Sequence, residues 1–147
     1  MALCGWFIMP HLGADVSSKV AKILEASREI EKYEKERSEA VRERILARFA
    51  EIGASPEPER LEQEMIYYLE KLDINEERVR LRQHCAYYLE TLGKEAYPGK
   101  KLGFIAQEMG REINTLGSKS NDADMQKIVV KMKDELEQIK EQVLNVL

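Results

Sequence analysis

The sequence is poor in the residues that make turns, disulfides and metal sites. Its 147 residues include only eight glycines, four prolines, two cysteines and two histidines. Few glycines and prolines predict few turns and long elements. The cysteines, Cys4 and Cys85, show neither a disulfide framework nor zinc-ligand spacing, so a reducing cytoplasm is the expected compartment. Two histidines are too few for an all-histidine metal site.

The chain also lacks an excess of positive charge. Its formal net charge of −4 argues against a protein that coats nucleic acid uniformly, but it leaves room for a local basic patch. No P-loop, GxGxxG pattern or catalytic triad is present, so nucleotide-dependent transfer receives little support. Acid/base or metal-assisted hydrolysis stays open. Charged residues make up 34% of the chain, a proportion typical of long exposed helices.

The apolar run from Met1 to Gly13 is too short to cross a membrane, which takes about 20 residues. No basic region precedes it and Pro10 interrupts it, so a signal peptide is disfavoured. We interpret residues 1–13 as an unplaced N-terminal segment that packs locally or frays, and we expect no membrane contact.

The rest of the chain has helical periodicity. Apolar residues recur at helical spacings from Ala14 to Ile52, through a nearly all-charged stretch from Glu31 to Glu39. This region is one long helix or two helices with a soft break. Gly53 is expected to serve as a C-cap before two prolines. Further helices are predicted at about residues 59–72, 76–92, 100–116 and 123–146.

These elements predict an all-α fold of long helical hairpins or a bundle of about five helices. The expected divisions are residues 1–13, a long helical region with a linker at 14–58, and a C-terminal helical domain at 59–147. Asn75 is expected to cap the third helix, and Ser120 or Asn121 the fifth. The predicted inward residues of the second to fourth helices are Leu61, Met65, Tyr68, Leu69, Leu72, Val79, Leu81, Cys85, Tyr88, Leu92, Leu102, Ile105, Met109, Ile113 and Leu116.

The fourth helix has a polar face as specific as its apolar face. Glu108 and Glu112 are four residues apart, so both carboxylates project from one side. Gln107 and Arg111 form the adjacent stripe, and Arg111 is within reach of Glu108. Paired carboxylates can hold a hard divalent cation through a few oxygens. The alternative is a salt-bridged solvent face, which charged helices often produce by chance.

Polar residues crowd the end of this helix. They are Asn114, Thr115, Ser118, Lys119, Ser120, Asn121 and Asp122. A capped turn needs only one or two such residues, and hydroxyl and backbone donors beside Lys119 would suit a phosphate group. By spacing alone, a functional site and a well-capped turn are equally favoured.

A second polar cluster runs from Asp73 to His84. Glu76 and Arg80 are four residues apart, and Glu77 and His84 share a face. His84 is a candidate metal ligand or general acid/base, although a lone histidine on a helix is more often structural. The cations available nearby for phosphate contact are Arg78, Arg80, Arg82, Lys100 and Lys101.

Four separated blocks of the sequence carry a family resemblance. They are RLEQE (60–64), LDINEERVRLRQH (72–84), GKKLGFIAQEMGREINTLGSKSND (99–122) and KDELEQIKEQVLN (133–145). In order, spacing and identity they resemble the C-terminal domain of the YicC family. The resemblance is close from about residue 60 onward and looser over 14–53. It implies a bacterial endoribonuclease that depends on a divalent metal, with manganese implicated and magnesium as the alternative, and helical hairpins that help to form a homo-oligomeric ring, a hexamer in family members.

Together, the residue chemistry and the resemblance suggest roles for matching positions. The candidate metal ligands are Glu108, Glu112, Asp73 and Glu77. The candidate catalytic residues are Glu108, Arg111, Glu112 and His84. The candidate RNA-binding residues are Arg80, Lys100, Lys101, Asn114, Ser118 and Lys119. In this hypothesis Arg111 and Lys119 steady the phosphate while metal-bound water attacks or is deprotonated.

Two departures from the family pattern bear on this hypothesis. Family members carry a β-containing domain ahead of this region, and residues 1–13 match nothing there, so the chain is interpreted as a truncated product or fragment. It is expected to be inactive alone if that domain shapes the RNA channel or the oligomer. Gly110 stands where many members have asparagine. The alternatives are a non-catalytic RNA-binding or oligomerisation module and a bare structural bundle.

Overall fold

The computed structural model describes residues 2–53, 57–94, 98–120 and 122–146, and all of its regular elements are α-helices. The helices are α1 (Ala2–Ile52), α2 (Pro58–Leu72), α3 (Asn75–Lys94), α4 (Gly99–Lys119) and α5 (Ala123–Val146). The described residues contain no strand. The prediction of an all-α fold with about five helices is therefore confirmed.

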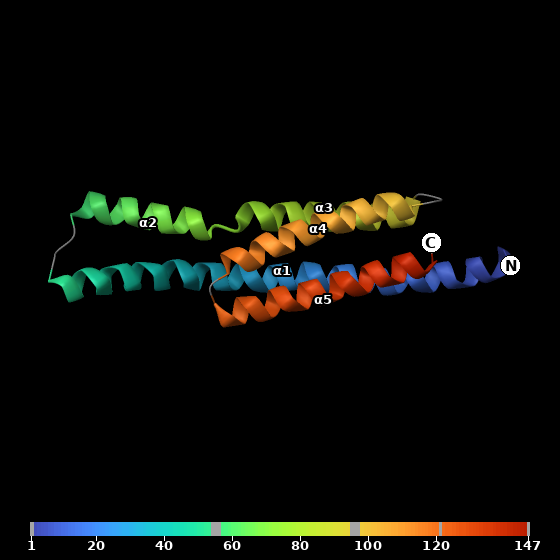
Figure 1. Ribbon diagram of the computed structural model, residues 1–147, viewed down its shortest axis with the longest axis horizontal. Helices are drawn as coiled ribbons and strands as arrows, with labels where there is room; N and C mark the ends of the chain where they lie inside the picture. The colour runs from blue at the N-terminus through green and yellow to red at the C-terminus, as the bar shows by residue number, and fades with distance from the viewer. Residues whose placement is uncertain (1, 54–56, 95–97, 121, 147) are drawn as a thin grey trace.

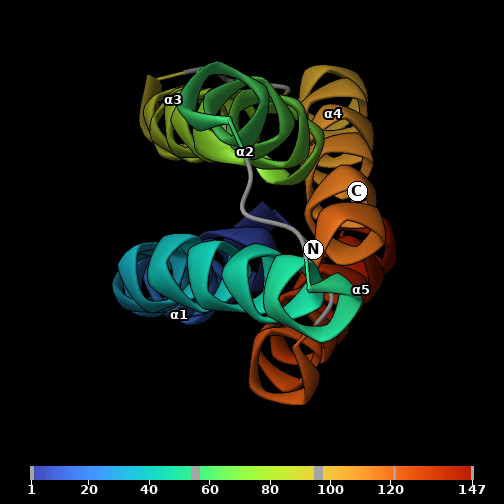
Figure 2. The same ribbon diagram turned by 90° about the vertical axis from the view of Figure 1, so that its left-hand side faces the viewer.

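The helices form an elongated body built along α1 (Figure 1). From the far end of α1, α2 and then α3 return beside it, and α4 and α5 form a further hairpin. Viewed along the long axis, α1, α3, α4 and α5 surround a common centre (Figure 2). The polar turn between α4 and α5 consequently lies near the middle of the molecule, close to the α2–α3 junction.

The first helix is continuous. The charged stretch around Glu31–Glu39 contains no break, and residues 2–13, which the sequence left unplaced, continue the same helix. Gly53 ends it with a positive φ of 69°, and its N–H donates to the Ala50 carbonyl at 3.1 Å. The predicted C-cap is confirmed, since glycine tolerates this left-handed conformation best.

The core lies where the first part of α1 meets α3, α4 and α5. Its most completely buried side chains include Ile23, Ile30, Leu81, Tyr88, Leu102, Met109, Ile113, Leu116, Met132 and Ile139. On α3 the buried row is Glu77, Leu81, Cys85, Tyr88 and Thr91. Leu92 is only half-buried but packs against this core, as predicted. The prediction for Val79 was wrong, since it is half-buried and is not among the residues packed against the core. Val79 lies two residues, or about 200° of helical turn, from Glu77.

The second helix contributes no fully buried residue within the described part of the chain. Leu61, Met65 and Tyr68 are half-buried, and Leu69 is exposed. The predicted apolar face is therefore only partly covered by α1. The side chain of Leu72 lies outside the described residues.

Two predicted helix caps are corrected. The Asn75 N–H donates to Asp73 Oδ1 at 2.9 Å, so Asp73, and not Asn75, caps α3. The Asp124 N–H donates to Asp122 Oδ1 at 2.9 Å, which gives Asp122 the same role for α5. Aspartate two residues before a backbone donor forms this turn readily. Ser120 instead ends α4, and its hydroxyl donates to the Leu116 carbonyl. Asn121 lies outside the described residues.

None of the helices in the described ranges is long and apolar enough to cross a membrane.

Candidate functional site

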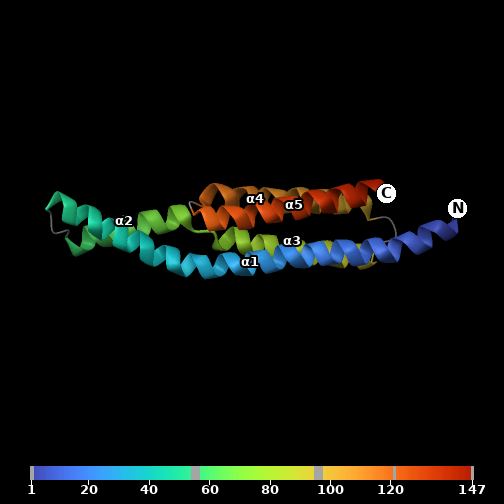
Figure 3. The same cartoon turned by 90° about the horizontal axis from the view of Figure 1, so that it is seen from below.

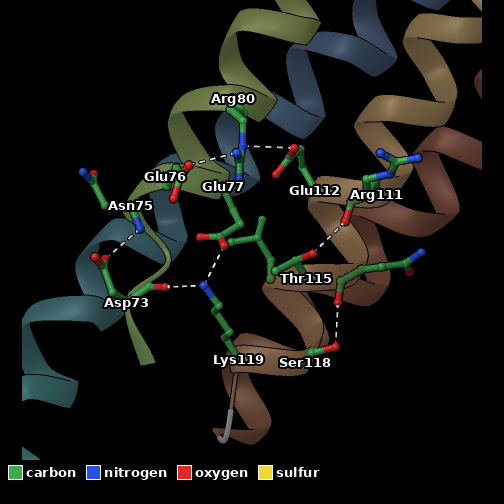
Figure 4. A network of polar contacts seen from close by, with 12 residues as sticks. Asp73, Asn75, Glu76, Glu77, Arg80, Arg111, Glu112, Thr115, Ser118 and Lys119 are labelled. Carbon is green, nitrogen blue, oxygen red and sulfur yellow. Dashed lines mark hydrogen bonds and ion pairs between the residues drawn. The ribbon is translucent and has the colours of Figure 1, made fainter. Parts of the chain in front are cut away.

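The two polar clusters of the sequence meet where the α2–α3 junction faces the end of α4 (Figure 4). The Lys119 ammonium donates to Glu77 Oε1 at 2.6 Å and to the Asp73 carbonyl at 3.0 Å. The Glu77 side chain is only 5% exposed, and its second oxygen, Oε2, is buried without a hydrogen-bond partner in the described structure. A buried carboxylate is costly unless it is paired, so Lys119 is an essential partner for Glu77.

A second ion pair joins the same two helices, but here α3 supplies the cation and α4 supplies the acid. The Arg80 guanidinium on α3 lies 3.2 Å from Glu112 Oε1 on α4, and it also donates to Glu76 Oε1 at 2.9 Å. The Glu112 side chain is buried, whereas Arg80 remains partly exposed. Each helix thus supplies one buried acid and receives one cation from its neighbour. We call Glu77, Lys119, Arg80 and Glu112 the reciprocal pairs.

The two acids predicted to act together on α4 have different partners. Glu108 is partly exposed and lies 3.7 Å from Arg111, whose side chain points largely to solvent. Glu112 is instead turned toward α3. Four residues turn an α-helix through about 400°, so the two side chains are offset by about 40° around the axis. This offset lets Glu112 face Arg80 on α3 while Glu108 faces Arg111 on α4.

Two hydroxyls predicted to be phosphate donors are engaged within α4. Thr115 Oγ1 donates to the Arg111 carbonyl, and Ser118 Oγ donates to the Asn114 carbonyl, each at 3.1 Å (Figure 4). These are the usual contacts of hydroxyls four residues along a helix. Both side chains reach the surface, so a ligand could still compete for them.

The described residues of one chain do not by themselves fit a divalent metal ion. No three histidine, cysteine, aspartate or glutamate side chains gather closely enough among the described residues to hold one. Glu77 and Glu112 each face a cation, and Asp73 Oδ1 caps α3. The four predicted metal ligands therefore have separate partners and do not converge on one point in the described structure.

The remaining candidates lie farther from the reciprocal pairs. His84 is half-buried on α3, and Lys100 is exposed at the start of α4. Lys101 lies 5.2 Å from the centre of the Tyr87 ring in a cation–π contact. Along α4, Lys101 is roughly 27 Å from Lys119 at 1.5 Å per residue. The predicted RNA-binding residues thus divide between two ends of α4.

Arg78, one of the cations considered for phosphate contact, ties α3 to α1. Its guanidinium lies 3.0 Å from Glu31 and 3.2 Å from Glu34, and the Arg78 side chain is mostly buried. Gly110 faces α5, where a Cβ would lie 3.4 Å from Leu136 Cδ2. The departure from the family at position 110 therefore lies at the α4–α5 contact and not at the reciprocal pairs.

Sequence reasoning missed a cleft between α2 and the second half of α1, of about 1090 Å³. Its cationic lining residues are Arg37, Arg44, Arg48, Arg60, Lys71 and Lys119. The spacing of seven and then four residues between Arg37, Arg44 and Arg48 was a sequence signal for one helical face. Burial lowers the pKa of Arg37, an effect that Asp122 and Glu34 oppose.

Comparison with known proteins agrees with the resemblance. Residues 30–147 match the family described as "Endoribonuclease YicC-like, C-terminal". A protein of Clostridioides difficile (strain 630) named "Probable endoribonuclease YicC" is 38% identical over 138 residues, which cover 92% of this chain and 47% of that protein. A Haemophilus influenzae protein of the same name is 42% identical over 104 residues, 71% of this chain and 36% of that protein.

The chain thus spans about half the length, or less, of the curated relatives that it matches. The matched range begins within α1 and includes all of α2 to α5, so both reciprocal pairs lie inside it. On this evidence the chain belongs to the YicC-like endoribonuclease family, as a match to its C-terminal domain.

Proposed function

We propose that this chain takes part in the endonucleolytic cleavage of RNA and that the reciprocal pairs form its phosphate-binding centre. The observation that carries the proposal is the pairing of two buried acids with two accessible cations at one helix junction. It is supported by the relatives, which are named probable endoribonucleases.

The chemistry of the centre suits a phosphodiester. Lys119 and Arg80 are both partly exposed, so each has donors left for an anionic oxygen while a buried carboxylate holds its position. Positioned cations that stabilise charge developing on a phosphoryl group are a common source of rate enhancement. Arg111, which is more exposed, can reach a phosphate from the outer side of α4.

Glu108 is the acid best placed for proton transfer within this proposal. It is partly exposed and its only described partner, Arg111, is 3.7 Å away. A general base must be accessible to the proton it removes, and Glu77 and Glu112 are too deeply buried for that role. His84 is the alternative base on α3.

We include in the proposal that cleavage depends on Mn²⁺, with Mg²⁺ as the second choice. The positions of the side chains do not supply an argument for this dependence. Because the acids of one chain do not converge, we derive no step through a metal ion. Assays with each ion and with a chelator measure the requirement directly.

The decisive experiment compares cleavage of an end-labelled RNA hairpin by the wild type and by Glu112→Gln. This substitution keeps the size of the side chain and removes the charge that holds Arg80. We expect cleavage to fall at least tenfold, while circular dichroism shows an intact helical fold. Glu90→Gln, in an exposed α3 pair with Lys94, is the matched control and should cleave normally.

Two results would count against this proposal. Equal cleavage by Glu112→Gln and the wild type would show that the reciprocal pairs are not part of the active site. No cleavage by the wild type with Mn²⁺, with Mg²⁺ or without metal shows that this chain is not a nuclease by itself.

The second candidate function is a non-catalytic module that binds RNA and assembles into oligomers. It is favoured by large apolar side chains that are exposed on the helices, among them Ile66, Tyr67, Phe104 and Val130. Exposed apolar groups of this kind suit subunit contacts. RNA binding without turnover, by a protein that sediments as an oligomer, would support this function.

A further inference from the structure

The cleft between α2 and the second half of α1, which we call the basic cleft, differs in charge from the rest of the molecule. Six cationic and three acidic side chains line it, giving a net charge of +3, although the whole chain has a net charge of −4. The acidic members are Glu36, Glu64 and Asp122. A concave surface of one sign concentrates ligands of the opposite sign.

Four of these six cations have no partner among the residues that the structure describes. Arg44, Arg48, Arg60 and Lys71 form no hydrogen bond or ion pair with any residue in the described ranges. The other two cations of the basic cleft do have partners, since Lys119 pairs with Glu77 and Arg37 donates to the Lys119 carbonyl. Arg44, Arg48, Arg60 and Lys71 are therefore available for an external anion.

Aromatic rings lie among the cations. Tyr33 and Phe49 of α1 and Tyr68 of α2 line the basic cleft, and all three are only half-buried. The Tyr68 ring meets Tyr67 edge-on, with ring centres 5.6 Å apart and an interplanar angle of 80°. Flat rings among cations are the features with which proteins bind single-stranded nucleic acid, since bases stack on the rings and phosphates meet the cations.

The basic cleft leads to the reciprocal pairs. Lys119 lines it and also holds Glu77. At the same place Arg37 donates to the Lys119 carbonyl and to Met125 Sδ. From Tyr33 to Phe49 the lining extends about 24 Å along α1 at 1.5 Å per residue. That is the length of roughly seven stacked nucleotides at 3.4 Å each.

We propose that the basic cleft binds a single strand of RNA and directs it toward the reciprocal pairs. Arg44, Arg48 and Lys71 contact phosphates, and bases stack on Tyr68 and Phe49. The inference rests on the proposed function for the identity of the ligand as RNA. A duplex does not fit the proposal, because paired bases do not present their faces to the rings. An acidic peptide would meet the cations but leave the rings unused.

The test is direct binding of a fluorescein-labelled 12-nucleotide single strand of RNA, followed by fluorescence anisotropy in EDTA. Chelation prevents metal-dependent cleavage, so binding is measured whether or not the chain is a nuclease. The variant Arg44→Gln/Arg48→Gln should bind at least tenfold more weakly. For single strands the logarithmic salt slope changes by about 0.7 for each phosphate contact, so the double variant should lose about 1.4 from its slope.

Arg42→Gln is the matched control. Arg42 is exposed on the same helix two residues before Arg44, but it does not line the basic cleft. Its replacement removes one positive charge from the same region and should change affinity less than twofold. A loss equal to that of the Arg44 and Arg48 variants would show a non-specific charge effect and overturn the proposal.

Tyr68→Ala tests the stacking part separately. We expect about tenfold weaker binding with an unchanged salt slope, because a ring contributes through base stacking and not through ion release. Phe104→Ala is the control, since Phe104 is 61% exposed on α4 and does not line the basic cleft. Circular dichroism of each variant checks that its helices are intact.

The outcomes separate this inference from the proposed function. Binding through the basic cleft without any cleavage overturns the nuclease proposal alone. Cleavage by the wild type, with unchanged binding by Arg44→Gln/Arg48→Gln, overturns the basic cleft alone. Preference for duplex RNA, or equally tight binding of a polyglutamate peptide at the same residues, also overturns it. The proposal is also overturned if sedimentation shows a dimer that is lost in Arg44→Gln/Arg48→Gln while RNA binding is unchanged in the same variant.

Discussion

The two halves of this elongated molecule differ in what their helices bury. In one half, α3, α4 and α5 pack on residues 16–30 of α1 and enclose a continuous aliphatic core. In the other half, α2 accompanies the rest of α1, where Ile45 is the one hydrophobic residue that is buried among those described. Figure 3 shows α4 and α5 beside only the first of these halves. We call them the core half and the arm.

The difference shows that two regions with similar helical periodicity can have different roles, one in stability and one in binding. Apolar periodicity is present in both halves, but only the core half has enough neighbouring helices to cover it. In the arm, half-buried rings and unpaired cations face the basic cleft. Burial provides most of the folding free energy, so the core half should determine stability and the arm should contribute chiefly to binding.

The largest expected effect is on thiol reactivity. Cys85 is fully buried, and burial raises its pKa to about 12, so at pH 8 its thiol is both inaccessible and protonated. In a Cys4→Ser background, we expect Cys85 to react with a thiol reagent at least about a thousandfold more slowly than an unfolded peptide thiol, since reaction needs opening of the core.

The matched arm probe is Glu62→Cys, at an exposed position of α2, in a chain with both natural cysteines replaced. It should react nearly as fast as a free thiol. Similar slow rates at both positions would show that the arm is as well protected as the core half, and the comparison would fail.

Next in size is the effect of removing a core side chain. Ile113 is 0% exposed and Ile66 on α2 is 50% exposed. Ile113→Ala should lower the free energy of unfolding by about 3 kcal/mol through lost burial and a residual cavity. Ile66→Ala should change it by less than about 1 kcal/mol. Chemical denaturation measures both, and equal losses would contradict the division into two halves.

A smaller effect is expected at the boundary between the halves, where Lys119 pairs with Glu77. Lys119→Met leaves a buried carboxylate without its cation and should cost about 2 kcal/mol, less than for a fully buried pair because Lys119 is partly exposed. Adding Glu77→Gln should restore part of this loss. Lys94→Met, in an exposed pair with Glu90, should cost at most about 0.5 kcal/mol.

If Lys119→Met proves as harmless as Lys94→Met in thermal and chemical unfolding, Glu77 does not depend on Lys119. The reciprocal pairs would then lack the structural basis that we assign to them.

Several parts of the candidate site were predictable from local pattern. Glu76 and Arg80 pair at a spacing of four residues, and Glu108 and Arg111 lie together as their spacing of three indicates. What could not be predicted is that Glu77 is buried while Glu76 is exposed. Both are charged residues at a helix start, and only the position of α4 distinguishes them.

The sequence by itself determined the number and approximate ends of the helices and the family, because periodicity, glycine and proline act locally and the matching blocks are read in order along the chain. Tertiary structure alone decided the exchange of partners between Glu77–Lys119 and Arg80–Glu112, and the position of the basic cleft. These features join residues about 30 to 80 positions apart. Their energies depend on the distance and burial of groups from different helices, which no local spacing specifies.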